Sequence, residues 1–295
     1  MSMEQTKIPT WGIVTTARAT PRDIARFVAH HLGLGAARID IYLDGQDPPP
    51  LAHPRLRFHA GAKAAHLHHR QMANAAHCYG DTTLDWLAHI DLDEFLLPEQ
   101  PLAKQLAQLP ENIAQAKLMP VEALAPLTGP VRHFKRPSAQ AGQPRAVLET
   151  LYPDYGLHLR SGLISHSEGK AIFRTRLPLK PGVHRFRQNA PAARLPLTPL
   201  AHIHAPSWQA FQAALPARLK SGSYAAARPG QISIQTLLET LQDTGGEPAV
   251  KAFFQTVSTA SPDHLAALDA LGMLLTQDLQ LDAKAQTLFP DLPQE

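Results

Sequence analysis

The sequence predicts an α/β protein in which helices flank a sheet and a helical region follows at the C-terminal end. Two patterns predict this class. Short β-prone apolar runs alternate with amphipathic helical segments in the first part of the chain, which is typical of strand–helix–strand units. After residue 206 the apolar residues recur mostly at helical spacing. We therefore expect a sheet domain over residues 1–206 and a helical region over residues 207–295 that packs on it.

The composition excludes several classes of protein. Of the 295 residues, 44% are hydrophobic and 18% are charged, so the chain is not disordered, and a formal charge of +3 is too small to indicate a nucleic-acid partner. The single Cys78 excludes an internal disulfide and fits a reducing compartment. No apolar run approaches the length of a bilayer span or a signal peptide. These features predict a cytoplasmic protein without a transmembrane segment, and they leave peripheral association with a membrane open.

The chain opens with a predicted strand, helix and strand. Residues 11–16 are apolar and β-prone, Thr20 is a suitable N-cap before the helix, and residues 38–43 resume a β-rich pattern. A right-handed crossover makes the two strands parallel, so the residues that follow them lie at one edge of the sheet, where α/β proteins bind ligands. The candidate ligand-binding residues at this edge are Thr16, Arg18 and Asp44.

The alternation of strands and helices continues along the chain. Further strands are expected at residues 55–59, in the segment that leads to Asp91, and at residues 116–124, 170–174, 182–186 and 200–204. Helices are expected at residues 63–79 and 102–109, after Ser207, and at residues 232–241, 248–257, 262–275 and 283–289. Residues 128–144 show little periodicity, which predicts a mobile loop.

An apolar strand runs into three clustered acids, Asp91, Asp93 and Glu94. A buried strand cannot hold ionised carboxylates without a counter-charge, and a divalent cation would supply one. Asp91 and Asp93 are two residues apart, so they would point to the same side if the strand geometry persisted. The alternative is a strand that ends in a solvated polar loop.

Several short motifs, separated along the chain, together resemble those of a known family. They are residues 27–35 with 41–44, Arg70-Gln71 with Asn74, residues 85–95, residues 169–174 with Val183-His184, and His202 with Ser207 and Phe211. In this order and spacing they resemble the bacterial glycosyltransferase family 2-like group and the related family 92 enzymes, over roughly residues 10 to 215. Two positions depart from the family pattern: Ala17-Arg18 stands where Asn-Glu is usual, and Ile203 where an aromatic is usual.

The resemblance implies a GT-A fold, which is a Rossmann-like nucleotide-binding mixed sheet flanked by helices. It implies a metal-dependent glycosyltransferase of surface polysaccharide or glycoconjugate synthesis, with a nucleotide-sugar donor, a UDP-sugar first among them, and a carbohydrate acceptor. Asp93 would ligate Mn²⁺ or Mg²⁺, and Asp91 would reach the ribose or, through water, the metal. His202 would be a third metal ligand, and His204 faces the same side.

The remaining candidate site residues each have more than one interpretation. Asp44 would bind the base or ribose, or simply form a turn, and Arg70 and Lys170 would bind diphosphate oxygens, or be surface cations. Glu94 is either catalytic or a structural acid. An inverting transfer needs a general base for the acceptor hydroxyl, and Asp154 is the candidate because Tyr152 and Tyr155 beside it could stack on a sugar ring.

Two further functions compete with this one. A zinc hydrolase would use His202 with His204, His66 with His68, and the aspartates as a metal cage, because alternating histidines on a strand can serve such a site. A non-catalytic nucleotide-binding protein would fit the departure at Ala17-Arg18 and the absence of an obvious general base.

Overall fold

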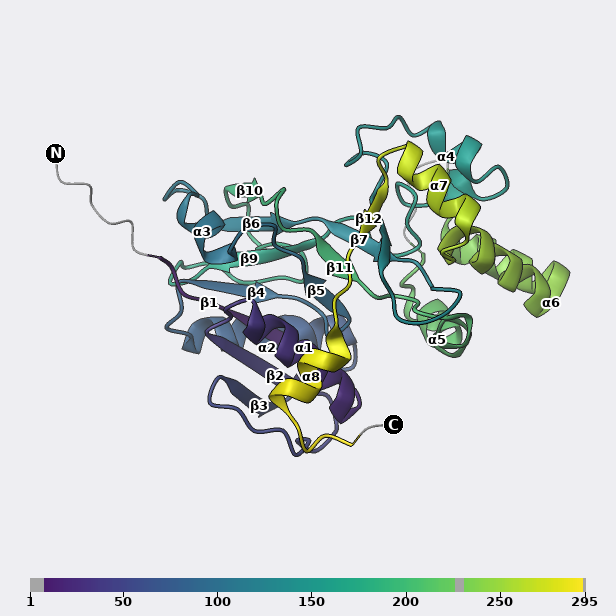
Figure 1. Cartoon of the computed structure of the whole chain (residues 1–295). Helices are drawn as coiled ribbons and strands as arrows, with labels where there is room; N and C mark the ends of the chain where they lie inside the picture. The colour runs from purple at the N-terminus through teal and green to yellow at the C-terminus, as the bar shows by residue number, and fades with distance from the viewer. Residues whose placement is uncertain (1–7, 226–230, 294–295) are drawn as a thin grey trace. The chain divides into compact units, whose positions relative to one another are not determined.

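The computed structural model describes residues 8–225 and 231–293. These residues form two compact units, each made of separate stretches of the chain (Figure 1). Unit 1 comprises the chain up to Met119, Glu168–Leu200 and the chain from Gln280 onwards. Unit 2 comprises Pro120–Ser167 and Ala201–Leu279. The chain therefore passes between the units repeatedly, whereas the sequence suggested one boundary after residue 206.

Unit 1 is built on a mixed sheet. In the described part of the chain it has seven strands in the order β10-β6-β9-β4-β1-β2-β3. Their bounds are β1 Trp11–Ala17, β2 Arg38–Leu43, β3 Leu56–Ala60, β4 Trp86–His89, β6 Gln115–Leu118, β9 Lys170–Arg174 and β10 Ala192–Arg194. The strands β4, β1, β2 and β3 are mutually parallel, while β9 is antiparallel to both β4 and β6. This confirms the predicted α/β class with a mixed sheet.

The opening strand–helix–strand unit forms as its local signals predict. Helix α1, Pro21–Gly33, has Thr20 as its N-cap, and the Thr20 hydroxyl accepts a hydrogen bond from the Asp23 backbone N–H at 3.2 Å. Gly35 follows the helix with φ 94°, a conformation that glycine adopts without steric cost. The chain then enters β2 parallel to β1, with Gly12 paired to Arg38.

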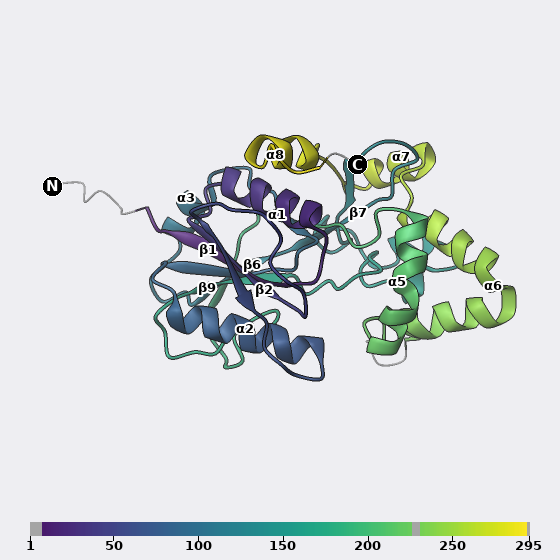
Figure 2. The same cartoon turned by 90° about the horizontal axis from the view of Figure 1, so that it is seen from below.

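Helices cover both faces of this sheet. Figure 2 shows α1 on one face and α2, Leu67–Asp81, on the other. The last helix, α8 Leu281–Leu288, packs on α1, and its Asp282 forms salt bridges with Arg22 and Arg26. The remaining elements of unit 1 are α3 Leu102–Ala107 and the short strand β5 Glu94–Leu96. Strands β1, β2 and β4 are almost wholly buried, so the core of the unit lies along them.

Unit 2 combines short strands with helices. Its described strands are β7 Pro120–Ala123, β8 His133–Lys135, β11 Leu200–His202 and β12 Leu274–Thr276, in the order β12-β8-β7-β11. Its helices are α4 Val147–Leu151, the 3₁₀ turn η1 Gly156–His158, α5 Trp208–Ser221, α6 Ile234–Ser258 and α7 Pro262–Ala270. Helix α6 is kinked at Gly246, where φ is 61°, two residues before Pro248. The core includes Tyr152, Phe211 and Phe253.

Four sequence expectations were wrong in detail. Residues 128–144 contain β8 rather than only a loop, and residues 182–186 contribute only an isolated bridge between Pro181 and Phe186. The predicted strand over residues 116–124 divides at Met119 into β6 and β7, which belong to different sheets. The helix predicted to reach Leu275 ends at Ala270, because Gly272 at φ 65° turns the chain into β12.

Candidate functional site

The acidic motif lies in the turn that joins β4 to β5. Strand β4 ends at His89, so Asp91 and Asp93 do not share a strand face as the sequence suggested. Two hydrogen bonds close the turn: the Glu94 N–H donates to the Asp91 carbonyl at 3.0 Å, and the Asp91 N–H donates to Glu94 Oε2 at 2.8 Å. Glu94 is fully buried, so its contacts are those of a structural acid that shapes the turn.

Lys170 supplies the counter-charge that a buried acidic motif requires. Its Nζ lies 2.6 Å from Asp91 Oδ2 and 3.6 Å from Glu94 Oε2, and its side chain is only 1% exposed. Burial by itself would lower the pKa of the Lys170 amine, but the charges of Asp91 and then Glu94 raise it above the ordinary value. Lys170 was predicted to bind diphosphate oxygens. In this structure it is buried against Asp91 instead, and that burial does not support a direct contact with phosphate.

Asp91 is held from two sides. Lys170 donates to its Oδ2 from β9, while the Gln71 amide of α2 donates to its Oδ1 at 2.7 Å. The antiparallel pairing of β4 with β9 explains the first contact, because it sets Ala171 opposite His89 and so brings Lys170 to the carboxyl end of β4. Asp91 is thus a fixed hydrogen-bond acceptor.

His89 is a buried neighbour of this group that the sequence did not single out. Its Nδ1–H donates to the Gly182 carbonyl at 3.0 Å. Burial, and secondarily the positive charge of Lys170, lower its pKa to about 4. The imidazole is therefore neutral near pH 7 and adds no charge beside the acids.

Helix α2 reaches the ends of the first two strands as well. Arg70 forms a salt bridge with Asp44, the residue after β2, with Nη2 2.9 Å from Oδ2. Asn74 donates to the Thr16 hydroxyl at the end of β1, at 2.8 Å. One helix face therefore presents polar side chains to β1, β2 and β4 in turn.

The structure brings most of the predicted residues of unit 1 to this edge. The predicted residues whose side chains make contacts at the carboxyl ends of the parallel strands are Thr16, Asp44, Arg70, Asp91 and Lys170. Arg18 follows β1 but is exposed, and Asp93 is half-buried in the turn. The arrangement offers fixed acceptors, Asp44 and Asp91, each already paired with a cation, which suits the recognition of ligand hydroxyl or amide groups.

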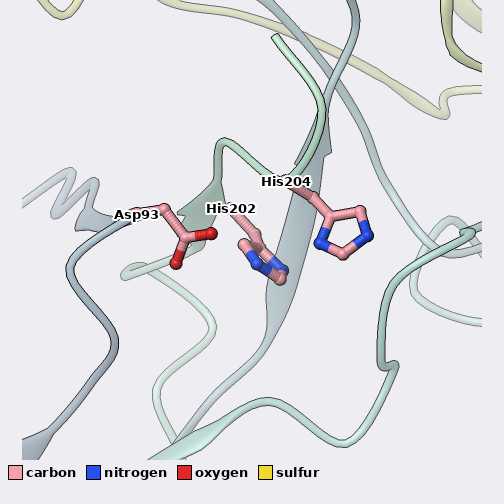
Figure 3. Close-up of side chains that lie close together, drawn as sticks. All are labelled: Asp93, His202 and His204. Atoms are coloured by element: carbon pink, nitrogen blue, oxygen red, sulfur yellow. The ribbon is translucent and has the colours of Figure 1, made fainter. Parts of the chain in front are cut away.

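Unit 2 carries the predicted histidines. His202 is the last residue of β11 and is 5% exposed, and its ring centroid lies 5.0 Å from that of His204. Figure 3 shows these two rings. The His204 Nε2 is hydrogen-bonded to the Tyr224 hydroxyl at 2.7 Å. Burial, followed by the nearby His202, lowers the pKa of His204 well below the ordinary value, so the ring is neutral.

Sequence reasoning missed His166. Its ring centroid lies 5.2 Å from that of His202, although 36 positions separate the two residues in the chain. The only local signal was that His166 stands shortly before the Gly169-Lys170 segment, and this signal could not show which strand it would meet. Unit 2 therefore brings His166 and His204 each close to His202, and all three side chains are of a type that can ligate a metal ion.

Asp154 lies in a turn of unit 2 and is exposed. The aromatic rings beside it are not arranged to stack on a sugar. Tyr152 is buried, with its hydroxyl bonded to His264 Nε2 at 2.7 Å, and the Tyr155 ring packs edge-on against Phe253 at 5.1 Å. Tyr152 and Tyr155 therefore pack in the core of unit 2, and the expectation that their rings could stack on a sugar is wrong.

Comparisons with known proteins add little to the site. No protein-family model matches the chain, and no curated protein matches it. Among solved structures, the crystal structure of HddC from Yersinia pseudotuberculosis is similar at a TM-score of 0.33 and 9% identity, over 70% of this chain and 99% of that one. None of the described helices is long and apolar enough to cross a membrane. The chain is a mixed α/β protein with an edge of paired polar side chains and a set of candidate metal ligands.

Proposed function

We propose that this protein is a metal-dependent glycosyltransferase with a GT-A-like fold that uses a nucleotide-sugar donor. The proposal rests on one observation. In unit 1 the polar residues Thr16, Asp44 and Asp91 are held at the carboxyl ends of neighbouring parallel strands by side chains of α2 and β9. Ligands of open α/β sheets bind at this edge, and dinucleotides and FMN are examples of them.

The metal is proposed to be held by Asp93, the half-buried acid of the turn. Because both oxygens of Asp91 already accept hydrogen bonds, Asp91 is better suited to a ribose hydroxyl than to direct ligation. A bound Mn²⁺ or Mg²⁺ would neutralise the negative charge that develops on the departing diphosphate. A carboxylate oxygen is a suitable ligand for a divalent ion of that kind.

The nucleotide is proposed to lie along the edge of β1 and β2. Asp44, fixed by Arg70, would accept a hydrogen bond from the base or ribose, and Thr16 and Arg18 would line the same loop. A UDP-sugar is the donor tested first, with a carbohydrate acceptor. Asp154 is retained as the general base of an inverting transfer because it is an exposed carboxylate, although no neighbouring ring supports it.

A second candidate is a zinc-dependent hydrolase. The observation that favours it is the gathering of His166, His202 and His204 in unit 2. Such an enzyme would retain zinc in stoichiometric amount through purification and would not respond to nucleotides. A protein that binds nucleotide diphosphate without transferring or hydrolysing any sugar would instead be a non-catalytic nucleotide-binding protein.

The test of the proposed function is a thermal-shift screen of UDP, GDP and CDP, each with and without Mn²⁺. We expect one nucleotide diphosphate to raise the melting temperature only when metal is present. The Asp93→Asn variant should melt like the wild type without ligand and lose the metal-dependent shift, because only the charge at the turn changes. Glu99→Gln, at an exposed acid outside the site, is the matched control.

The contrary result is equally clear. If no nucleotide diphosphate shifts the wild-type protein in Mn²⁺, the proposed donor class is wrong. An Asp93→Asn protein that keeps the full metal-dependent shift would show that the acidic motif does not hold the metal.

A further inference from the structure

Charged residues are distributed unevenly along this chain, although its formal charge is only +3. No Asp or Glu occurs between Glu168 and Glu239, whereas lysine and arginine recur throughout residues 170–194 of unit 1. Two of these cations, Arg185 and Arg194, are exposed, and their side chains make no hydrogen bond or salt bridge to any residue that the structure describes. Cations without acidic partners attract anions, so this part of unit 1 is a candidate anion-binding surface.

Strand register adds a third cation, Lys117. Strands β6 and β10 are parallel, and Arg194 lies directly opposite Lys117 near their carboxyl ends, an arrangement of like charges that is destabilising in a sheet. Burial lowers the pKa of Lys117, an effect that the charge of Glu168 opposes. The charges of Arg185 and Arg194 lower this pKa further, so both guanidinium groups lie near the amine. The three cations therefore form one cluster.

The backbone that carries Arg185 is fixed on both sides. The carbonyl of His184 accepts a hydrogen bond from the Lys117 amine at 3.1 Å, and the Phe186 N–H donates to Gln115 Oε1 at 2.9 Å. Phe186 is 1% exposed, which anchors this segment in the core of unit 1. Arg185 is therefore presented to solvent from a held position.

Lys117 has a donor to spare. Its ammonium group has three N–H donors, and two of them donate to the carbonyls of the described residues Glu168 and His184, at 3.1 Å each. These two contacts orient the amine and leave its third N–H for a ligand. Lys117 thus combines a fixed position with an available hydrogen bond.

The cluster lies at the sheet edge where the nucleotide is proposed to bind, but on different strands. Both β4 and β6 are antiparallel to β9, and β10 is parallel to β6, so the carboxyl ends of β4, β6 and β10 share one edge (Figure 1). In the order β10-β6-β9-β4-β1-β2-β3, the cations are separated from β1 and β2 by β4 and β9. A second substrate, rather than the nucleotide, fits this position.

We propose that Lys117, Arg185 and Arg194 bind an anionic group of the acceptor, and that the acceptor is an acidic carbohydrate with carboxylate groups along its chain. The inference rests on the proposed function, which requires a carbohydrate acceptor at this edge. Guanidinium and ammonium groups form charge-assisted hydrogen bonds with carboxylates. Three clustered cations fall short of the extended basic surface that nucleic acid requires.

The test measures the binding of fluorescently labelled oligogalacturonate to the purified full-length protein at low salt, without nucleotide or metal. The control probe is the same oligosaccharide with its carboxylates methyl-esterified, so that it has a similar chain but no charge. We expect the acidic probe to bind at least about tenfold more tightly than the neutral one. Added salt should weaken the binding of the acidic probe alone, because it screens exposed charges.

Arg185→Gln and Arg194→Gln should each weaken binding of the acidic probe by about fivefold, and the double variant should bind both probes alike. Arg57→Gln is the matched control, because Arg57 is an exposed arginine on β3, the other edge strand of the sheet. It should bind the acidic probe as the wild type does. Arg194→Gln should not lower the melting temperature, because it removes a like charge opposite Lys117.

The proposal is overturned if the neutral probe binds as tightly as the acidic one, or if folded Arg185→Gln and Arg194→Gln proteins both keep wild-type affinity. Binding to phosphatidylglycerol vesicles that depends on both arginines, without binding of the acidic probe, would identify a membrane surface as the partner and would also overturn it.

These outcomes are separable from the test of the proposed function. Binding of the acidic probe that depends on both arginines, without any nucleotide effect, would support the anion site and reject the glycosyltransferase. Metal-dependent nucleotide binding without binding of the acidic probe would support the proposed donor and reject the acidic acceptor.

Discussion

At the scale of single residues, Lys170 illustrates what a sequence shows and what it conceals. From the sequence, Asp91, Asp93 and Lys170 were singled out separately, and the prediction that buried acids need a positive counter-charge is correct. A metal ion was expected to supply that charge. The antiparallel pairing of β9 with β4 delivers a lysine instead, and strand pairing between segments about 80 residues apart has no local signature.

Replacing Lys170 by methionine should therefore destabilise the protein. Two carboxylates, those of Asp91 and Glu94, would lose their cation, and removing one partner of a buried ion pair typically costs about 3–5 kcal/mol. Urea unfolding at pH 7 measures the change. Lys104→Met, at an exposed lysine of α3, is the control and should be neutral. An unfolding free energy equal to that of the wild type would show that Lys170 is not the counter-charge.

At the scale of elements, local signals predicted the helices and the parallel strands well. Thr20 and Ser207 cap α1 and α5 as expected, since a cap is read from neighbouring residues. Strands β8 and β12 were missed because they pair with each other across more than 130 residues. For the same reason Lys135 of β8 was predicted to lie in a mobile loop. Its side chain is in fact fully buried, and its Nζ lies 3.7 Å from Glu122 Oε1.

Helix α1 and strand β5 are joined by two buried histidines. His30 Nε2–H donates to the Leu96 carbonyl at 2.8 Å, and its Nδ1 accepts from Lys284 at 3.3 Å. His31 Nδ1–H donates to the Phe27 carbonyl, and its Nε2 accepts from the Leu96 N–H at 3.3 Å. Burial lowers the pKa of His30 to about 4 and that of His31 well below the ordinary value. Both rings are thus neutral in the folded protein.

Because of these two histidines, we expect the free energy of unfolding to decrease in acid. The pKa of His30 is about 6.5 in the unfolded chain and about 4 when folded, so the unfolded state binds more protons between these values. The contribution of the neutral His30 ring to the free energy of unfolding is complete above about pH 6.5. It decreases by about 3 kcal/mol as the pH falls to about 4. His30→Gln, which keeps the donor to Leu96, should flatten this part of the curve of unfolding free energy against pH. His69→Gln should not, and an unaltered slope in His30→Gln would refute the assignment.

At the scale of the whole molecule, the two units are interleaved in sequence. Unit 2 is built from Pro120–Ser167 and Ala201–Leu279, while unit 1 includes α8. Composition shifts in the sequence pointed only to the onset of the helical region near residue 207. They could not show that residues 120–167 would join that region, because the contacts between these segments are not local.

A fragment that stops at residue 206 should therefore fail to fold as an independent domain. It would lack α5, α6, α7 and β12 of unit 2, which cover apolar residues such as Tyr152, and it would lack α8, which covers α1. We expect an insoluble fragment, or one without a cooperative thermal transition by circular dichroism. A soluble fragment that melts cooperatively would show that residues 207–295 form a separable module.

The position of α8 has a consequence for how the protein is made in the cell. Every strand of the seven-stranded sheet has been synthesised once β10 ends at Arg194, yet α8, the helix that packs on α1, begins only at Leu281. At about 5–20 residues per second, translation of the intervening segment takes on the order of ten seconds. During that interval the nascent sheet exposes the apolar surface of α1, so the growing chain is a natural client for chaperones that act at the ribosome.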